Sequence, residues 1–340
     1  MGKIVCFGEL MMRLNPQGFL RLGQAGCLET SFAGGEANVS VSLANYGADV
    51  KYITKLPNNA LGIQARNELR RYGVDCTGIV WGGPRLGIYF VEKGASQRPS
   101  KVLYDRAGSS VSLARREDFN WESILEDVSW FHFTGITPAL GQELPAICLD
   151  ALQCCQKKGI RVSCDLNYRQ ALWNRETAGK VMKKLMPYVD LCIANEEDAA
   201  DIFQIYADRT DVSEGRVDRQ AYMDVARRLS ECFGFSWVAI TLRTSLSADD
   251  NKWSGLLYDG ISCFLSPEYS MHIVDRVGGG DSFSGALIYA LTQGWDGQRT
   301  VHFAAAASCL KHSIPYDFNQ VTADEVQQLM DGNRSGRVLR

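Results

Sequence analysis

Three consecutive glycines followed by an aspartate make the stretch 278–281 the part of this sequence best suited to chemistry. Beyond it, apolar residues recur at the spacing of one buried helix face, and the helix is expected to end near Gly294. Glycines let backbone N–H groups turn toward a ligand, and a helix N-terminus adds partial positive charge. The pattern predicts an anion site, for which phosphate is the commonest occupant. Asp281 then either does chemistry beside the phosphate or simply caps the helix.

A second glycine pair precedes another helix near the start of the chain. Gly34 and Gly35 lead into a run of small residues that ends at Tyr46-Gly47, with Asn38 one turn inside the predicted helix. The amide of Asn38 can both donate and accept hydrogen bonds, so this element could contact a ligand. Tight packing of the helix on a strand would explain the glycines equally well.

Strands and helices alternate along most of the chain, which favours an α/β fold. Strands are predicted at 3–8, 50–54, 128–133, 160–165, 189–194 and 237–242, and helices at 59–71, 142–158, 177–188, 219–232, 282–294 and 300–312. Two short antiparallel edge strands are expected at 252–258 and 269–273, whereas 15–30 is predicted to be irregular and 206–215 a charged surface loop.

A hairpin interrupts this alternation. Two stretches, 85–92 and 101–106, have the alternating pattern of strands joined by a polar turn, which suggests a small separate sheet that could cover a site. Tyr89, Tyr104 and Arg106 alternate suitably for one face of it, either as ligand contacts or as ordinary cross-strand pairs.

Two polar clusters follow predicted strands of the main sheet. They span 165–169 and 195–198, directly after the strands at 160–165 and 189–194. Ligands of open parallel sheets bind at the carboxyl ends of the strands, so both clusters are candidate binding segments.

Composition limits the class of protein. The 340 residues are 46% apolar and 22% charged, and the net charge of −3 is spread without a basic stripe, which argues against a nucleic-acid partner. No apolar run is long enough to cross a membrane. The 11 cysteines lie mostly in apolar runs without metal-ligand spacing, so we expect a reduced, cytoplasmic protein without a structural metal.

Taken together, the two glycine elements and the inserted hairpin resemble the ribokinase-like (PfkB) family of carbohydrate kinases. The resemblance covers nearly the whole chain and rests on the stretches 34–38 and 275–281. It implies a doubly wound, mostly parallel sheet flanked by helices, with a small β-sheet lid. We therefore expect one domain over 1–330, a lid formed by parts of 10–33 and 83–110, and a frayed tail at 331–340.

The resemblance also implies roles for individual residues. Asp281 matches the catalytic base of these kinases, and the amides of Gly278, Gly279 and Gly280 match their anion hole. ATP and Mg²⁺ are the implied cofactors, and participation of a monovalent cation stays open. The nucleotide is expected near Gly278, Gly280, Asn167, Asn195, Thr241 and Arg243. Asp198 stands where the family has a magnesium-organising glutamate, so it would act on the metal indirectly.

Within the family, the sequence is most similar to 2-keto-3-deoxygluconate kinases, which phosphorylate a sugar acid. The likeness lies in 103–109, 165–169 and the strand that contains Tyr89. Arg106 and Arg169 suit the carboxylate of a sugar acid, because a guanidinium group can bind a carboxylate with two hydrogen bonds. The implied substrate contacts are Gly34, Gly35, Asn38, Tyr89, Tyr104, Arg106, Arg169 and Asp317.

Other functions stay open at this point. A kinase of a neutral sugar or nucleoside would use the same base, and a sugar-binding regulatory protein could retain the fold without turnover. The chain lacks a G-x-x-x-x-G-K-[ST] loop and a G-x-G-x-x-G turn after the first strand, which argues against P-loop enzymes and dinucleotide dehydrogenases. The resemblance further implies a homo-oligomer, with a dimer formed through the lid.

Overall fold

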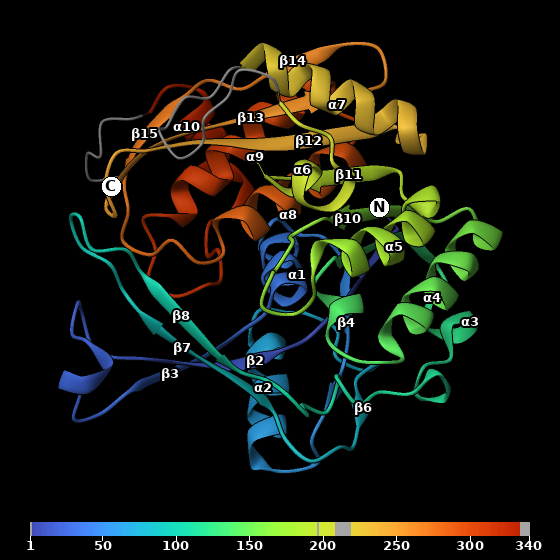
Figure 1. Cartoon of the computed structure of the whole chain (residues 1–340), viewed down its shortest axis with the longest axis vertical. Coiled ribbons are helices and arrows are strands. Elements are labelled where there is room, and N and C mark those ends of the chain that lie inside the picture. Colours follow the sequence, from blue (N-terminus) through green and yellow to red (C-terminus); the bar gives the residue numbers. More distant parts are fainter. Residues whose placement is uncertain (1, 196, 208–218, 334–340) are drawn as a thin grey trace.

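The computed structural model describes residues 2–195, 197–207 and 219–333. Within these ranges the central feature is a twisted sheet in the strand order β14-β13-β12-β11-β10-β9-β1-β4, with β15 paired to β13 (Figure 1). Its parallel strands are β1 (Lys3–Phe7), β4 (Val50–Ile53), β9 (Val128–Thr134), β10 (Arg161–Asp165), β11 (Leu191–Ala194) and β12 (Trp237–Ser245). The antiparallel ones are β13 (Asp250–Tyr258), β14 (Cys263–Leu265) and β15 (Tyr269–His272).

Helices cover both faces of this sheet, which confirms the predicted doubly wound α/β fold. Strand β1 shows why: Ile4 and Cys6 face one hydrophobic core, while Val5 and Phe7 face the other. The first core packs on α1 (Gly35–Asn45), α2 (Ala60–Arg71), α8 (Gly279–Thr292), α9 (Gly297–Lys311) and α10 (Ala323–Met330). The second packs on α3 (Trp121–Ile124), α4 (Leu144–Lys158), α5 (Arg175–Leu185), α6 (Asp198–Phe203) and α7 (Arg219–Phe233).

A second sheet projects from this body at the lower left of Figure 1. Its order is β3 (Glu29–Ala33), β2 (Met11–Asn15), β7 (Gly87–Glu92) and β8 (Lys101–Asp105), and we call it the small sheet. The remaining pieces are the strand pair β5 (Lys55–Leu56) and β6 (Val80–Trp81), and the 3₁₀ helices η1 (Leu22–Gln24), η2 (Arg116–Asp118), η3 (Thr137–Ala139) and η4 (Met186–Tyr188).

Several sequence expectations need correction. The stretch 15–30, predicted to be irregular, ends inside β3, and β2 ends at its first residue. Helix α8 begins at Gly279 rather than after Asp281, and α9 begins at Gly297, capped by the Asp296 side chain, which accepts a hydrogen bond from the Arg299 amide. Helices α6 and α10 and strand β14 were not predicted, although Thr322 and Glu325 form a capping box, which is a sequence signal for the start of α10.

Two expectations lie largely outside the described residues. These are the charged loop at 206–215, of which only 206 and 207 are described, and the tail at 331–340, of which 331–333 are described. In the described part of the chain, no helix is long and apolar enough to cross a membrane.

Candidate active site

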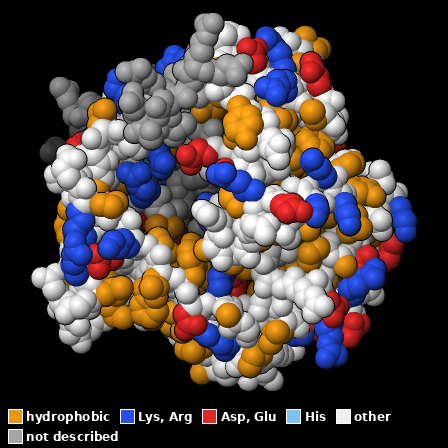
Figure 2. Space-filling model, viewed as in Figure 1, with side chains coloured by type: hydrophobic (Ala, Val, Ile, Leu, Met, Phe, Trp, Pro, Cys, Tyr) orange, Lys and Arg blue, Asp and Glu red, His pale blue; other side chains and the backbone are white. Residues whose placement is uncertain are grey.

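A cavity of about 610 Å³ opens at the carboxyl ends of β1, β9, β10, β11 and β12, between the main sheet and the small sheet. Figure 2 shows this face of the molecule hollowed, with basic and acidic side chains around the hollow. Every predicted site residue lines the cavity. They are Gly34, Gly35, Asn38, Tyr89, Tyr104, Arg106, Asn167, Arg169, Asn195, Asp198, Thr241, Arg243, Gly278, Gly279, Gly280, Asp281 and Asp317.

Asp281 is the third residue of α8, and its side chain faces the cavity rather than the helix end. Its Oδ2 accepts a hydrogen bond from Asn38 Nδ2 at 2.6 Å. The N-cap residue of α8 is Gly278, so the interpretation of Asp281 as an N-cap is wrong. Burial raises the pKa of Asp281 to about 7, with Asp317 and Glu36 adding to the rise while Asn38 and Arg169 oppose it. A carboxyl group that ionises near neutral pH is well suited to general-base work.

The three glycines before Asp281 differ in what they make room for. Gly278 has a φ of +86°, and a Cβ there would lie 2.0 Å from the backbone oxygen of Asp317. A Cβ on Gly279 would lie 2.3 Å from the ring of His312. Beside Gly280, in contrast, nothing lies within 4 Å. The first two glycines permit packing of the loop, and the third leaves its backbone open toward the cavity.

The other glycine pair shows the same division. A Cβ on Gly34 would lie 1.9 Å from the backbone oxygen of Glu9, which supports the packing interpretation at that position. A Cβ on Gly35 would make only ordinary contacts, at 3.5 Å to Thr134 and 3.6 Å to Asp281 Oδ1. Gly35 therefore brings the start of α1 against the carboxyl group of Asp281.

The small sheet contributes a pair of tyrosines. Tyr89 and Tyr104 face each other across β7 and β8, with stacked rings whose centroids are 5.9 Å apart. The hydroxyl of Tyr89 donates to Asp317 Oδ2 at 2.7 Å, and Tyr89 is buried whereas Tyr104 is exposed. The two predicted sugar contacts Tyr89 and Asp317 are thus already joined to each other.

The two predicted carboxylate-binding arginines have different surroundings. Arg106 is buried and donates from Nε to Glu9 Oε2 at 2.7 Å, and its Nη2 contacts the same oxygen, so its charge is compensated. Arg169 is exposed to the cavity, and its positive charge lowers the pKa values of Asp165, Asp198 and Asp281 against the effect of their burial. Arg169 therefore supplies more uncompensated positive charge to a ligand than Arg106.

Asp165, at the end of β10, and Asp198, at the start of α6, form an acidic wall of the cavity. Burial raises the pKa of Asp165 well above its usual value, and the charges of Asp198 and Asp281 raise it further. Asp198 accepts backbone hydrogen bonds from Tyr168 and Asn195, both at 3.0 Å. Repelling carboxylates at one wall suit a cation, but among the described residues no group of three or more His, Cys, Asp or Glu could hold a metal directly.

Four of the predicted nucleotide residues, Asn167, Asn195, Thr241 and Arg243, lie on β12 and the loops after β10 and β11, and Gly278 and Gly280 lie at the start of α8. Thr241 and Arg243 are on β12, and Asn195 Oδ1 accepts the amide hydrogens of Glu197 and Asp198. Arg276 joins this group: its pKa is lowered by burial and by the charge of Arg243. Two guanidinium groups that repel each other beside a cavity attract an anion.

Sequence reasoning missed some residues of this region. Asp165 and Arg276 stand in the quoted motifs but received no role, although the position of Asp165 at the end of a strand was a usable signal. Arg13 carried no signal, because its partners Asp275 and Asp317 lie 262 and 304 residues away in the sequence.

Comparison with known proteins gives the family. Residues 1–314 match the family described as "pfkB family carbohydrate kinase". A solved 2-dehydro-3-deoxygluconokinase from Thermotoga maritima is 50% identical with a TM-score of 0.94, covering 97% of this chain and 99% of that one. A 2-dehydro-3-deoxygalactonokinase from Haloferax volcanii is 32% identical over 98% of both chains.

A structure of a putative 2-keto-3-deoxygluconate kinase from Enterococcus faecalis is 26% identical, has a TM-score of 0.91 and covers 99% of each chain. The resemblance inferred from the sequence is thereby confirmed for the fold and the class of enzyme. The buried carboxyl group at a glycine-rich helix start and these relatives lead to one conclusion: the chain belongs to the pfkB family of carbohydrate kinases.

Proposed function

We propose that this kinase transfers the terminal phosphoryl group of ATP to a hydroxyl of 2-keto-3-deoxygluconate, with Asp281 as general base. The observation that best supports this proposal is the position of Asp281. Its carboxyl group has a pKa of about 7, lies in the first turn of α8 and faces the cavity next to Gly280, beside which nothing lies within 4 Å.

In the proposed reaction, Asp281 takes the proton of the sugar hydroxyl while the hydroxyl oxygen of the sugar forms the new bond to phosphorus. The bond from that phosphorus to the departing ADP oxygen breaks, and the proton remains on the carboxyl group. The first amides of a helix have no intrahelical acceptor, so those of Gly278, Gly279 and Gly280 are available to the phosphoryl oxygens. Such transfer depends mainly on positioning and electrostatics.

The sugar acid would lie between α1 and the small sheet. Its carboxylate is assigned first to Arg169, which lines the cavity, and second to Arg106, which is already hydrogen-bonded to Glu9. Its hydroxyls would meet Tyr89, Tyr104, Asp317 and Asn38, and Gly34 and Gly35 line the cavity beside them.

The nucleotide would occupy the end of the cavity near β12, with Asn167, Asn195, Thr241, Arg243 and Arg276 along it. Mg²⁺, when bound, would neutralise charge on the phosphates. Asp198 and Asp165 would hold it through water, because both Asp198 oxygens already accept backbone hydrogen bonds. Dependence on a monovalent cation is a separate question, answered by turnover with and without added K⁺.

Two relatives are named for different sugar acids, the 50% identical structure for 2-dehydro-3-deoxygluconate and the 32% identical protein for 2-dehydro-3-deoxygalactonate. The higher identity supports the gluconate. These two sugar acids differ in the configuration of one carbon, so a measured ratio of kcat/KM values for the two decides between them.

The test is ADP release measured across both sugar acids, neutral ketoses and nucleosides. We expect turnover with the sugar acids and little with the neutral compounds. Asp281→Asn should lose on the order of 10³-fold in kcat while still binding both ligands. Preference for a ketose or nucleoside would refute the substrate, and near wild-type turnover of Asp281→Asn would refute the base.

We also infer a dimer formed through the small sheet. All residues of its edge strand β8 are exposed, including the apolar Val102, Leu103 and Tyr104. An exposed apolar edge strand is a surface on which a second copy can pair. Light scattering should give a dimer for the wild type and a monomer for Leu103→Asp; a monomeric wild type would contradict the inference.

The cytoplasm is the location we infer for this enzyme. All 11 cysteines are free, including the adjacent Cys154 and Cys155. Free thiols suit a reducing compartment.

A further inference from the structure

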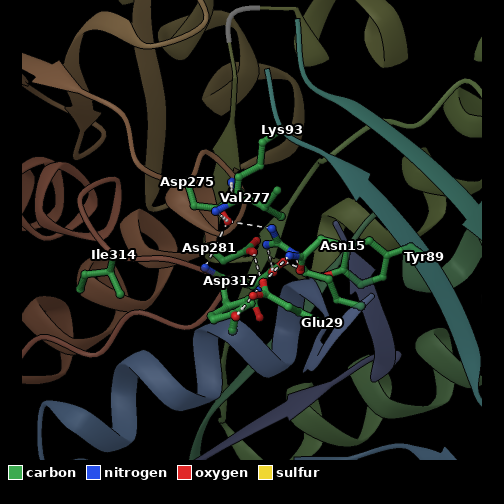
Figure 3. Close-up of polar contacts among 12 residues, drawn as sticks. Asn15, Glu29, Tyr89, Lys93, Asp275, Val277, Asp281, Ile314 and Asp317 are labelled. Carbon is green, nitrogen blue, oxygen red and sulfur yellow. Dashed lines mark hydrogen bonds and ion pairs between the residues drawn. The ribbon is translucent and has the colours of Figure 1, made fainter. Parts of the chain in front are cut away.

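Arg13 is a fully buried arginine on strand β2 of the small sheet, and it does not line the cavity. Its guanidinium donates from Nη1 to Asp317 Oδ1 at 2.6 Å and from Nη2 to Asp275 Oδ2 at 2.7 Å. Its Nε donates to Asn15 Oδ1 at 3.2 Å, which holds the planar group in one orientation. Figure 3 shows Asn15, Asp275 and Asp317 grouped together. A single side chain thus joins the small sheet to two segments far away in the sequence.

The first partner, Asp275, fixes the start of the glycine loop. Its Oδ1 accepts the amide of Val277 at 3.3 Å, directly before Gly278, and its Oδ2 accepts the amide of Tyr316 at 3.1 Å. Lys93, just after β7, adds a second cation from the small sheet at 3.4 Å. The carboxyl group of Asp275 therefore holds the loop that leads to the proposed anion hole.

The second partner, Asp317, reaches the site from the other side. Its Oδ2 accepts the hydroxyl of Tyr89, and its backbone oxygen lies against Gly278 so closely that a Cβ there would be 2.0 Å away. A displacement of Asp317 would move both a proposed sugar contact and the first glycine of the anion hole.

Charge makes this arrangement depend on Arg13. Burial opposes ionisation of Asp275, but attraction to Arg13, Lys311 and Lys93 holds its pKa below the usual value. The Arg13 fork binds one oxygen of each carboxylate, a geometry that the single ammonium of a lysine does not reproduce.

We propose that Arg13 is a positioning residue that fixes the sugar-facing Asp317 and the phosphoryl-binding loop relative to each other. This inference rests on the proposed function, because it assigns Asp317 to the sugar and the loop to the phosphoryl group. The small sheet is then more than a cover for the cavity: through Arg13 and Lys93 it also holds the loop on which the transfer depends.

The test compares Arg13→Lys and Arg13→Met with Arg85→Lys as a control. Arg85 pairs with Asp105 on the surface of the same sheet region and has no contact with the loop. A misplacement of about 1 Å can cost on the order of 100-fold in rate, so we expect kcat of Arg13→Lys to fall roughly 10- to 100-fold. The KM for the sugar acid should rise, and the KM for ATP should stay within about twofold.

The variants should follow the order Arg, Lys, Met in activity, and Arg85→Lys should equal the wild type. A second measurement separates positioning from folding. The groups that act on Asp281 are Asn38, Asp317, Glu36, Asp165, Arg169 and Lys311, and losing Arg13 leaves the charge of Asp317 less compensated. The acidic limb of the kcat/KM profile of Arg13→Met should then move to higher pH.

If Arg13→Met does not fold, Arg13→Lys alone decides. A folded Arg13→Lys whose kcat and sugar KM lie within about twofold of the wild type would overturn the inference. A wild type that phosphorylates no sugar acid would instead overturn the proposed function, so the two failures are distinguishable.

Discussion

The hydrogen bond from Asn38 to Asp281 offers a direct test of the proposed base. It is 2.6 Å long, and it lowers the pKa of Asp281 against the larger effect of burial. Replacing Asn38 by leucine keeps the volume of the side chain but removes the donor. The ionised carboxylate loses this stabilisation while the protonated form loses little, so the pKa of Asp281 should rise from about 7.

The size of the shift follows from the strength of the bond. A hydrogen bond to a charged group contributes about 1.5–3 kcal/mol. At about 1.36 kcal/mol per pKa unit, the pKa of Asp281 should rise by roughly 1–2 units. The acidic limb of kcat/KM against pH reports the base of the free enzyme, so this limb should move to higher pH by the same amount.

The matched control is Asn45→Leu in the same helix. Asn45 donates to the backbone oxygen of Asn319 at 2.7 Å and does not contact Asp281. Its loss should leave the acidic limb in place. If the limb of Asn38→Leu coincides with that of the wild type, either Asp281 is not the titrating base or the bond does not stabilise its charge, and the reasoning fails.

Other predictions follow from the charges around the cavity. The protonated carboxyl group of Asp281 carries no charge to desolvate, so the wild type should lose stability relative to Asp281→Asn as the pH rises from about 4 to about 7, by up to about 4 kcal/mol for a shift of about three units. Urea unfolding across that range measures this, and a difference independent of pH would contradict it. Arg169→Leu should weaken a sugar acid at least tenfold more than a neutral sugar, about 1.4 kcal/mol, and equal losses would remove the carboxylate argument. Arg276→Gln should raise the KM for ATP about tenfold and leave the sugar KM unchanged, because it removes one of two guanidinium groups at the nucleotide end; an unchanged ATP KM would refute that role.

The sequence was informative where chemistry depends on residues close together in the chain. The spacing of glycines, Asp281 and apolar positions predicted α8 and its place in the site, and the alternation of strands and helices predicted the main sheet. Strand β2 was missed because its residues are nearly all buried and show no alternation of polar and apolar types.

The electrostatic partners of the site could not be predicted in the same way. Arg106 was expected to meet a ligand carboxylate, but Glu9, 97 residues earlier, already binds it. Arg13 finds its partners only after three segments have folded together. Local patterns predict where a side chain stands, whereas the charges it meets depend on tertiary contacts.

The acidic wall of Asp165 and Asp198, together with the neighbouring Asp281, has a consequence for ligand binding. Burial raises the pKa of all three groups above the usual value, that of Asp281 to about 7, so Asp281 is still partly protonated near neutral pH, where a free carboxyl group is ionised. A ligand that brings positive charge to this wall lowers those pKa values and expels protons into the solvent. Calorimetric binding enthalpies measured in buffers of different ionisation heat should therefore differ, and their slope would count the protons released as the cavity fills.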